Sequence, residues 1–431
     1  MNAATAPATL PANGEAAAPA IPTLPAPPSG LYVHVPFCVS HCPYCDFVVV
    51  AGREARGPVN RIGQFLEALE VELELRADAL DDRRGRPGHG DRRPLDTLYL
   101  GGGTPSLVPG PRIAHLVELV RRRYGLAPDA EVTLEVNPGP DERGDARAMR
   151  DAGVTRLSIG AQSMDVGELR RLGRRHTPED VATTVAEARA AGIASISLDL
   201  LYDLPGATLK RWARTLEVAL ALEPDHVSLY ALTLDDPDLE GITGPAGDHL
   251  PTPPGARRWR DRARLDQDDD RAAAMYELAD RRVATAGLAW YEISNWAQPG
   301  HRSRHNLGYW QGASWEAVGP GAHAFDGVTR RWNAARLDAY IAALTPADGD
   351  VPMPPPGGRD LAPALQRGAE ASILALRTRF GLPAKALDDP EIGAALRWGV
   401  GMDLLEQTAE DRLVLTLRGR LVSNELFIRL V

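Results

Sequence analysis

The sequence predicts an α/β fold built on a parallel sheet. Strand-like apolar runs alternate with helical patterns six times within about 200 residues, and each crossover must return the chain to the same edge of the sheet. A hydrophobic fraction of 44% and a charged fraction of 25% are typical of a soluble globular protein. Periodicity does not decide whether the sheet is open or curled into a barrel.

The elements follow in a regular order. A strand over residues 31–35 leads directly into the cysteines, and apolar residues at helical spacing predict a helix over 62–80. Further strands are expected over 97–100, 131–136, 155–159, 193–201 and 226–232. The helices between them are expected over 111–124, 178–191 and 208–222, with one more that ends at 149 and another around 166. Thr177 can cap the helix that starts at Pro178, since proline fits the first helical turn.

Composition divides the chain into five segments. Residues 1–30 are rich in alanine and proline and predict a disordered tail, and residues 31–234 form the core. An extension follows over 235–345, in which the proline- and charge-rich stretch 235–270 is either a mobile cover or a surface insertion. Residues 346–358 indicate a linker, and 359–431 a small α+β domain, winged-helix-like, with helices near 361–377 and 390–405 and a hairpin through 413–417 and 421–427.

Charge and hydropathy exclude several functions. The net charge of -10 gives no electrostatic case for nucleic-acid binding. No apolar run approaches the ~18 residues that a membrane span requires. The N-terminal segment does not have the pattern of a secretory signal, and the thiols have no disulfide partners, so we expect a cytoplasmic protein.

The three cysteines of the chain, Cys38, Cys42 and Cys45, lie within eight positions. Three clustered thiolates are typical of a zinc site or an iron–sulfur cluster. Zinc would need a fourth protein ligand, whereas a four-iron cluster can leave one iron open. The candidates for that fourth zinc ligand are His34, His41 and Asp46. The spacing alone leaves both possibilities open.

Polar residues and glycines recur where the predicted strands end. A triple glycine, Gly101–Gly103, follows the second strand, Glu135 and Asn137 close the third, Gln162 follows the fourth, and Asp199 lies near the end of the fifth. In parallel α/β folds the carboxyl ends of the strands line the ligand site. We therefore expect one shared site. Asp199 in its apolar strand needs a partner, either an arginine or a ligand.

A second candidate site is the segment from His305 to Trp310. In a helix, His305 and Tyr309 lie one turn apart on the same face, with Asn306 and Trp310 adjacent. The segment could be aromatic packing around a satisfied histidine. Alternatively, it could present an aromatic surface with an imidazole available as an axial haem ligand.

Taken together, these motifs resemble those of the radical SAM proteins of the oxygen-independent coproporphyrinogen III oxidase type, and within them the HemW-type haem chaperones. The resemblance extends from about residue 31 to the C-terminus. Its motifs lie at 32–45, 101–105, 135–138, 162–163, 172–176, 199–206, 227–231 and 305–310.

The resemblance implies a partial (β/α)6 barrel, a 4Fe–4S cluster on Cys38, Cys42 and Cys45, and S-adenosylmethionine (SAM) on the open iron. The SAM contacts that it implies are Tyr32, Tyr44, Gly102, Gly103, Thr104, Glu135, Gln162, Arg174, Asp199 and Ala231. The haem-binding residues that it implies are His305, Asn306, Tyr309 and Trp310.

Departures from the oxidase and one complete motif favour the chaperone subgroup. The oxidase carries a further cysteine where this chain has Phe47, and its ordered N-terminal extension is replaced here by the alanine/proline tail. Conversely, the motif that marks the chaperone subgroup is complete at His305, Asn306, Tyr309 and Trp310. The resemblance then implies transfer of haem to acceptor haemoproteins such as respiratory-chain components, by a monomer or a homodimer, without assigning any catalytic residue. The alternative is an enzyme that decarboxylates coproporphyrinogen III. Asp203 and Ala207 depart from the glycine and glutamine common in the family.

Overall fold

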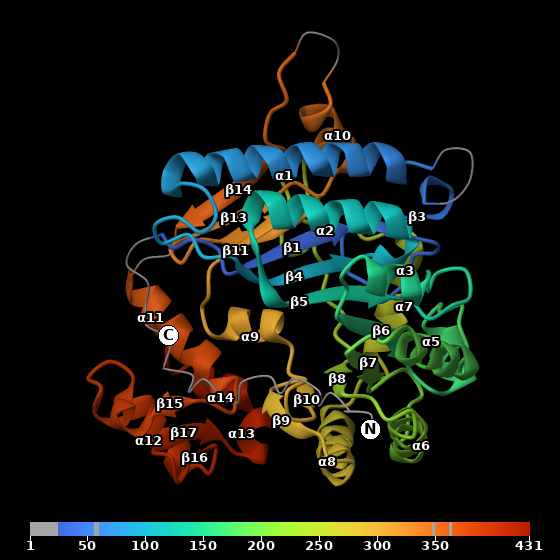
Figure 1. The fold of residues 1–431 in the computed structure, drawn as a ribbon. Coiled ribbons are helices and arrows are strands. Elements are labelled where there is room, and N and C mark those ends of the chain that lie inside the picture. The colour runs from blue at the N-terminus through green and yellow to red at the C-terminus, as the bar shows by residue number, and fades with distance from the viewer. Residues whose placement is uncertain (1–24, 56–59, 347–349, 362–363) are drawn as a thin grey trace, which may run out of the picture.

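The structure, a computed structural model, describes residues 25–55, 60–346, 350–361 and 364–431 (Figure 1). Most of the predicted N-terminal tail and part of the predicted linker lie outside these ranges.

The predicted parallel α/β core is confirmed. Six strands, each paired in parallel with the next, form the centre of a twelve-stranded sheet. They are β1 (Gly30–Val35), β4 (Leu95–Gly102), β5 (Leu126–Val136), β6 (Arg156–Gln162), β7 (Ser195–Tyr202) and β8 (His226–Ala231). This is the arrangement expected of a partial barrel, and the carboxyl ends of its strands lie at one edge.

Helices cover one side of this sheet, and the crossovers supply them as predicted. They are α1 (Ile62–Arg84), α2 (Gly110–Tyr124), α3 (Ala146–Asp151), α4 (Val166–Arg171), α5 (Pro178–Ala191) and α6 (Leu209–Leu220). Buried apolar side chains such as Phe65 and Leu69 of α1 fill the layer between helices and sheet. Thr177 caps α5 in a capping box with Asp180, as its sequence position predicts. Figure 1 shows α9 (Arg304–Trp310) on the other side of the sheet from α1 and α2.

The extension adds strands to both edges of the sheet. Strand β11 (Trp315–Val318) runs parallel to β1, and the antiparallel strands β12 (His323–Phe325), β13 (Thr329–Asn333) and β14 (Gly357–Leu361) follow it. At the opposite edge lie β10 (Asn295–Ala297) and β9 (Ala289–Glu292). Remaining elements are β2 (Phe37–Cys38), β3 (Val50–Ala51), η1 (Gly52–Glu54), η2 (Pro105–Leu107) and α10 (Leu337–Leu344).

One boundary of the predicted linker is wrong. Gly357 and Gly358 begin strand β14, which pairs with β13, so they belong to the main sheet and not to a connection over 346–358. A side chain at Gly358 would collide with the ring of Trp332, which explains the glycine by close packing.

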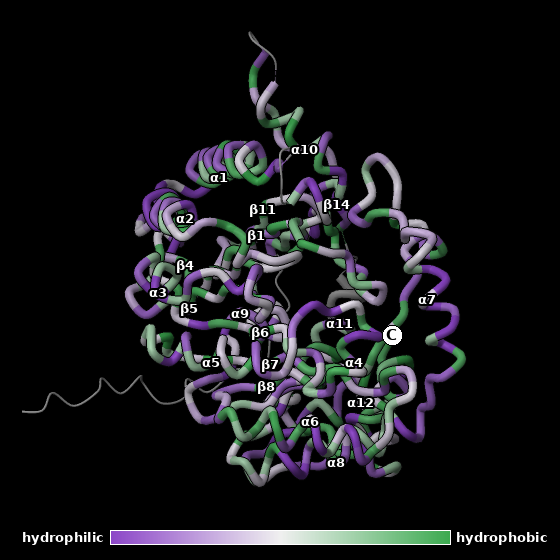
Figure 2. Tube along the Cα trace, turned by 90° about the vertical axis from the view of Figure 1, so that its right-hand side faces the viewer, coloured by the Kyte–Doolittle hydropathy of each residue, from purple (hydrophilic) through white to green (hydrophobic). Residues whose placement is uncertain are grey.

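The stretch 235–270 is ordered and carries secondary structure. It contains α7 (Pro254–Arg264) and the start of α8 (Asp269–Thr285). Helix α7 is almost entirely hydrophilic in Figure 2, and its few buried residues include Arg260. An isolated inward arginine on a polar helix points to a specific acceptor, which the cysteine loop supplies below.

The C-terminal unit has its own apolar core, around Leu376, Leu396 and Leu413. Its elements are α11 (Ala364–Leu376), β15 (Leu382–Pro383), η3 (Ala384–Asp388), α12 (Gly393–Gly401), β16 (Leu405–Gln407), β17 (Arg412–Leu415), α13 (Leu417–Leu421) and α14 (Ser423–Phe427). The predicted second hairpin strand over 421–427 is wrong, because this segment is helical. Thr416 caps α13 by accepting from the Gly419 amide at 2.9 Å, and the hairpin instead joins β16 to β17. The winged-helix likeness stays a prediction.

Candidate functional site

The cysteine loop runs between β2 and β3 and holds three free, partly exposed thiols. It is anchored by Arg260 of α7, which is 3% exposed. The Arg260 guanidinium donates from Nε to the Pro43 carbonyl at 3.1 Å and from Nη2 to the Cys45 carbonyl at 2.8 Å. Segment 235–270 therefore covers and fixes the cysteine loop.

A chain of polar contacts joins two of the thiols. Cys38 Sγ lies 3.2 Å from Thr104 Oγ1, which also accepts from Asn137 Nδ2 at 2.8 Å. Arg174 Nη2 donates to Asn137 Oδ1 at 2.7 Å, and Arg174 Nη1 lies 3.7 Å from Cys42 Sγ. The Arg174 Nε atom is buried and has no hydrogen-bond partner among the described residues. Arg174 thus contacts the thiol site, and its Nε–H group is left without a partner among the described residues.

The donor set fits an iron–sulfur cluster better than a zinc ion. Within the described ranges, no three His, Cys, Asp or Glu side chains converge as ligands of one metal ion. His34, a candidate fourth zinc ligand, uses both ring nitrogens, one with Tyr32 Oη at 3.0 Å and one with the Val48 carbonyl at 2.9 Å. A cubane places its three thiolates on different irons, so it requires no such convergence.

Burial would keep two of these thiols, those of Cys38 and Cys45, protonated in the absence of metal. It raises the pKa of the Cys38 thiol to about 12 and raises that of Cys45 as well. Binding of an iron–sulfur cluster would deprotonate the thiols, since only thiolates act as ligands.

The triple glycine brings the end of β4 against the cysteine segment. The Gly103 amide donates to the Val35 carbonyl at 2.8 Å, and a Cβ on Gly103 would lie 2.7 Å from the Phe37 carbonyl oxygen. Gly102 has a φ of 105°, which favours glycine. Its amide donates to Glu135 Oε2 at 2.9 Å, so the turn and the carboxylate at the end of β5 meet directly.

Two partly buried carboxyl groups lie on strands β5 and β7, on either side of β6. Glu135 accepts from Tyr99 Oη at 2.8 Å, and burial raises its pKa to about 7. Asp199 accepts from Ser158 Oγ at 2.8 Å and from Ser197 Oγ at 3.1 Å, and burial raises its pKa too. Among the described residues the partners of Asp199 are serine hydroxyls, and the expected arginine partner is not found there.

Most of the other predicted SAM contacts lie near the carboxyl ends of the strands. Tyr44 lies in the cysteine loop, Gln162 ends β6 with a left-handed φ of 62°, and Ala231 ends β8. Tyr32 lies deeper in the sheet, with its ring centroid 6.0 Å from that of Tyr99. All ten predicted contacts come from the part of the chain between β1 and β8. The hydrogen bonds described above involve four of them, Gly102, Thr104, Glu135 and Arg174.

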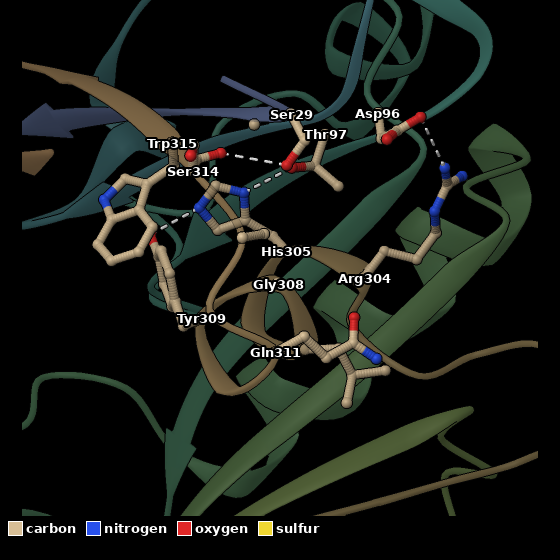
Figure 3. Close-up of a pocket in the computed structure, with 13 residues that line it drawn as sticks. Ser29, Asp96, Thr97, Arg304, His305, Gly308, Tyr309, Gln311, Ser314 and Trp315 are labelled. Atoms are coloured by element: carbon tan, nitrogen blue, oxygen red, sulfur yellow. Dashed lines mark hydrogen bonds and ion pairs between the residues drawn. The ribbon is translucent and has the colours of Figure 1, made fainter. Parts of the chain in front are cut away.

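The His305 segment forms helix α9, as expected, but its histidine is enclosed. Figure 3 shows the His305 ring between Thr97 and Tyr309. Its Nδ1 lies 2.7 Å from Thr97 Oγ1 and its Nε2 lies 2.7 Å from Tyr309 Oη, while the ring stacks on Tyr99 at 5.1 Å. Burial lowers the pKa of His305 to about 3. This is the satisfied-histidine arrangement, and ligation of an iron would require Tyr309 to release Nε2.

The four motif residues do not face one cavity. His305 and Tyr309 line a cavity of about 340 Å³ at the amino ends of β1 and β4, shown in Figure 3. Trp310 is outside that lining and packs under the guanidinium of Arg377, 4.7 Å from the ring centroid. Asn306 donates its amide to Ser303 Oγ at 3.3 Å, which caps α9.

Two supporting residues, Tyr99 and Arg260, carry no signal in the sequence that marks them as part of a site. Tyr99 joins the two candidate sites, since its hydroxyl contacts Glu135 while its ring contacts His305. Arg260 lies in a charged stretch that otherwise indicates a solvated surface. Asp203, where the family commonly has glycine, has a φ of 55°, and its carboxylate pairs with Arg271 Nε at 2.6 Å. The positive φ explains the glycine preference there.

Comparison with known proteins gives consistent results. Residues 32–219 match the family model of the radical SAM superfamily. The chain is 40% identical to the heme chaperone HemW of Mycobacterium tuberculosis, over 94% of this chain and 95% of that protein. It is 31% identical to the Bacillus subtilis heme chaperone HemW, over 92% and 97%.

Among solved structures, the chain resembles the coproporphyrinogen III oxidase HemN of Escherichia coli. The TM-score is 0.74 at 23% identity, over 94% of this chain and 91% of that one. At this identity the likeness shows the fold alone. A search of the described helices found none long and apolar enough to cross a membrane.

Proposed function

The chain belongs to the radical SAM superfamily and, within it, to the family of the heme chaperones named HemW, and from this premise we propose that it binds haem and transfers it to acceptor haemoproteins. The relatives that cover nearly the whole chain support this function by their names. Phe47, which is 60% exposed where the oxidase has a further cysteine, and the complete His305–Trp310 motif support it from the sequence.

The cofactor part of the proposal assigns a 4Fe–4S cluster to Cys38, Cys42 and Cys45. SAM would occupy the open iron and contact the ten residues named above. Support comes from the three free thiols and from the buried Arg174 Nε, a donor that a ligand could satisfy. When reduced, such a cluster can cleave SAM to a 5′-deoxyadenosyl radical, while the residues of this chain orient the bound SAM.

The haem part of the proposal assigns the motif residues His305, Asn306, Tyr309 and Trp310 to the haem site. Acceptors would include respiratory-chain haemoproteins, the compartment would be the cytoplasm, and a homodimer is compatible with this function. Unpaired thiols support the reducing compartment.

Anaerobic haem titration of the purified, cluster-reconstituted chain tests the proposal. We expect a saturable change in the Soret absorption at one haem per chain, with or without added SAM. The absence of saturable binding would refute the haem function.

The oxidase alternative makes a different prediction. An anaerobic assay with coproporphyrinogen III, SAM and an electron donor should give no vinyl product if the chaperone proposal holds. Sustained decarboxylation would favour the enzyme instead.

A further inference from the structure

A second cavity shares two of its lining residues with the cavity in Figure 3. Its volume is about 340 Å³, which falls within the range of small-molecule sites. Tyr309 and Trp315 line both cavities, with ring centroids 4.5 Å apart, and we call this pair the aromatic wall. The residues around this second cavity are Tyr32, His34, Phe47, Val48, Asp248, His249, Tyr309, Trp315, Gly321 and His323.

The lining of this second cavity is largely aromatic and apolar. Tyr32, Tyr309 and Trp315 contribute aromatic rings to the lining, and Phe47 and Val48 follow shortly after Cys45. Phe47 is 60% exposed, although large apolar side chains are usually buried. A flat, apolar, conjugated ligand would cover these rings and remove their surface from water.

A His–Asp–His cluster supplies the polar part of the cavity. Asp248 accepts from both imidazoles, with Oδ1 3.0 Å from His249 Nδ1 and Oδ2 2.7 Å from His323 Nε2. The carboxylate is engaged by both rings, so it is not left as a metal ligand. It fixes the ring orientation of His249 and leaves Nε2 as the remaining nitrogen of that ring.

The Nε2 atom of His249 has no hydrogen-bond partner in the described part of the chain, and 29% of the side chain is exposed. By contrast, His34 and His305 use both ring nitrogens. His323 retains Nδ1, but its ring stacks on Trp332 at 6.0 Å. Histidines that bind metals commonly present one nitrogen to the metal and donate the other N–H to a carboxylate, as His249 is placed to do.

We propose that His249 supplies the axial ligand to haem iron in this second cavity, with Asp248 and His323 as positioning residues. This inference rests on the proposed haem function and names the ligand of that site. The porphyrin would lie against Tyr309 and Trp315. His305 then contributes through the aromatic wall, because its Nε2 holds the Tyr309 hydroxyl at 2.7 Å.

The test is anaerobic haem titration of the full-length, reconstituted chain with spectroscopy of the bound haem. We expect His249→Ala to weaken haem binding roughly tenfold or more and to shift the Soret band. Added imidazole should restore the wild-type spectrum in that variant, which a merely structural defect would not allow. Substitution of the exposed His89 by alanine serves as the matched control and should change neither quantity.

A second variant keeps the ligand and alters its partner. Asp248→Asn should retain haem but change the spectroscopic signature of the iron–histidine bond, because the amide is a weaker acceptor for the His249 N–H. His305→Ala should keep the wild-type Soret position while binding haem less tightly.

The outcomes separate the two proposals. If wild-type protein binds no haem, the proposed function fails. If wild-type protein binds haem and His249→Ala gives the same spectrum, the axial-ligand assignment is overturned while the proposed function stands. Should His249→Ala not fold, an unchanged spectrum in Asp248→Asn overturns the assignment in its place.

Discussion

The cysteine loop and the His305 segment both appear in the sequence as cofactor motifs, yet the structure arranges them in opposite ways. The loop carries three free, partly exposed thiols, and distant elements hold it in place through Arg174 and Arg260. The His305 segment is a short helix whose imidazole is buried and fully hydrogen-bonded. The cysteine motif therefore has free ligand atoms for a metal, whereas both ring nitrogens of His305 are already hydrogen-bonded. The two motifs require different functional interpretations.

The largest effect should come from the thiols. Cys38→Ala, Cys42→Ala or Cys45→Ala should each abolish cluster assembly, since the chain has no other cysteine. Iron and sulfide analysis after anaerobic reconstitution measures this, with Ser40→Ala in the same loop as the control. A full cluster in any cysteine variant would contradict the ligand assignment.

Arg260 tests the claim that distant elements support the loop. Arg260→Met removes donors to the Pro43 and Cys45 carbonyls inside the protein, and each buried acceptor left unsatisfied costs about 1–3 kcal/mol. We expect a lower Tm and faster loss of the cluster to a chelator. Arg262→Met, an exposed change on the same helix, should have little effect on either. Equal cluster retention in both variants would show that α7 is only a surface insertion.

Glu135 should make SAM binding depend on pH. Burial raises its pKa to about 7, so the unliganded carboxyl is partly protonated at neutral pH. If SAM hydrogen-bonds to the ionised form of Glu135, SAM affinity should increase as the pH rises towards this pKa, by up to about tenfold per pH unit, and level off above it. Calorimetric titration at several pH values measures the slope. The isosteric change Glu135→Gln should flatten it, and an equal slope in the variant would assign the dependence to another group.

Substitution of Tyr309 should have the smallest effect, and it distinguishes His249 from His305 as the iron ligand. Tyr309→Phe keeps the aromatic wall but frees His305 Nε2. If His305 were the iron ligand, haem affinity should rise because its competitor is gone. With His249 as the ligand, we expect affinity to fall slightly, as in His305→Ala, because both variants remove the hydrogen bond between His305 and Tyr309, and we expect the Soret position to stay the same.

The sequence predicted the core well because its signals are local. Six strand–helix alternations and the capped helix at Thr177 depend only on neighbouring residues. The predicted strand over 421–427 is wrong because apolar residues at this spacing fit either a strand or a short helix. The tertiary contacts of Gly419 determine which of the two forms. The assignment of Gly357 to a linker is wrong because, in the sequence, a glycine required by strand packing cannot be distinguished from a glycine in a linker.

The candidate site was predictable only in part for the same reason. Three cysteines in one short segment are visible without a fold. The contact between Asp248 and His323 is not, since it depends on strand β12 returning beside the loop that carries His249. Arg260 also gains its role only when α7 packs on the cysteine loop.

Haem handover tests the central claim most directly. Haem-loaded protein is mixed anaerobically with a purified respiratory apo-haemoprotein, and the Soret band is followed as haem moves. The proposed function predicts that the acceptor gains its own haem spectrum while the donor loses haem in equal amount. Haem that stays on the donor, or that reaches the acceptor only at the rate of free haem, would contradict a chaperone.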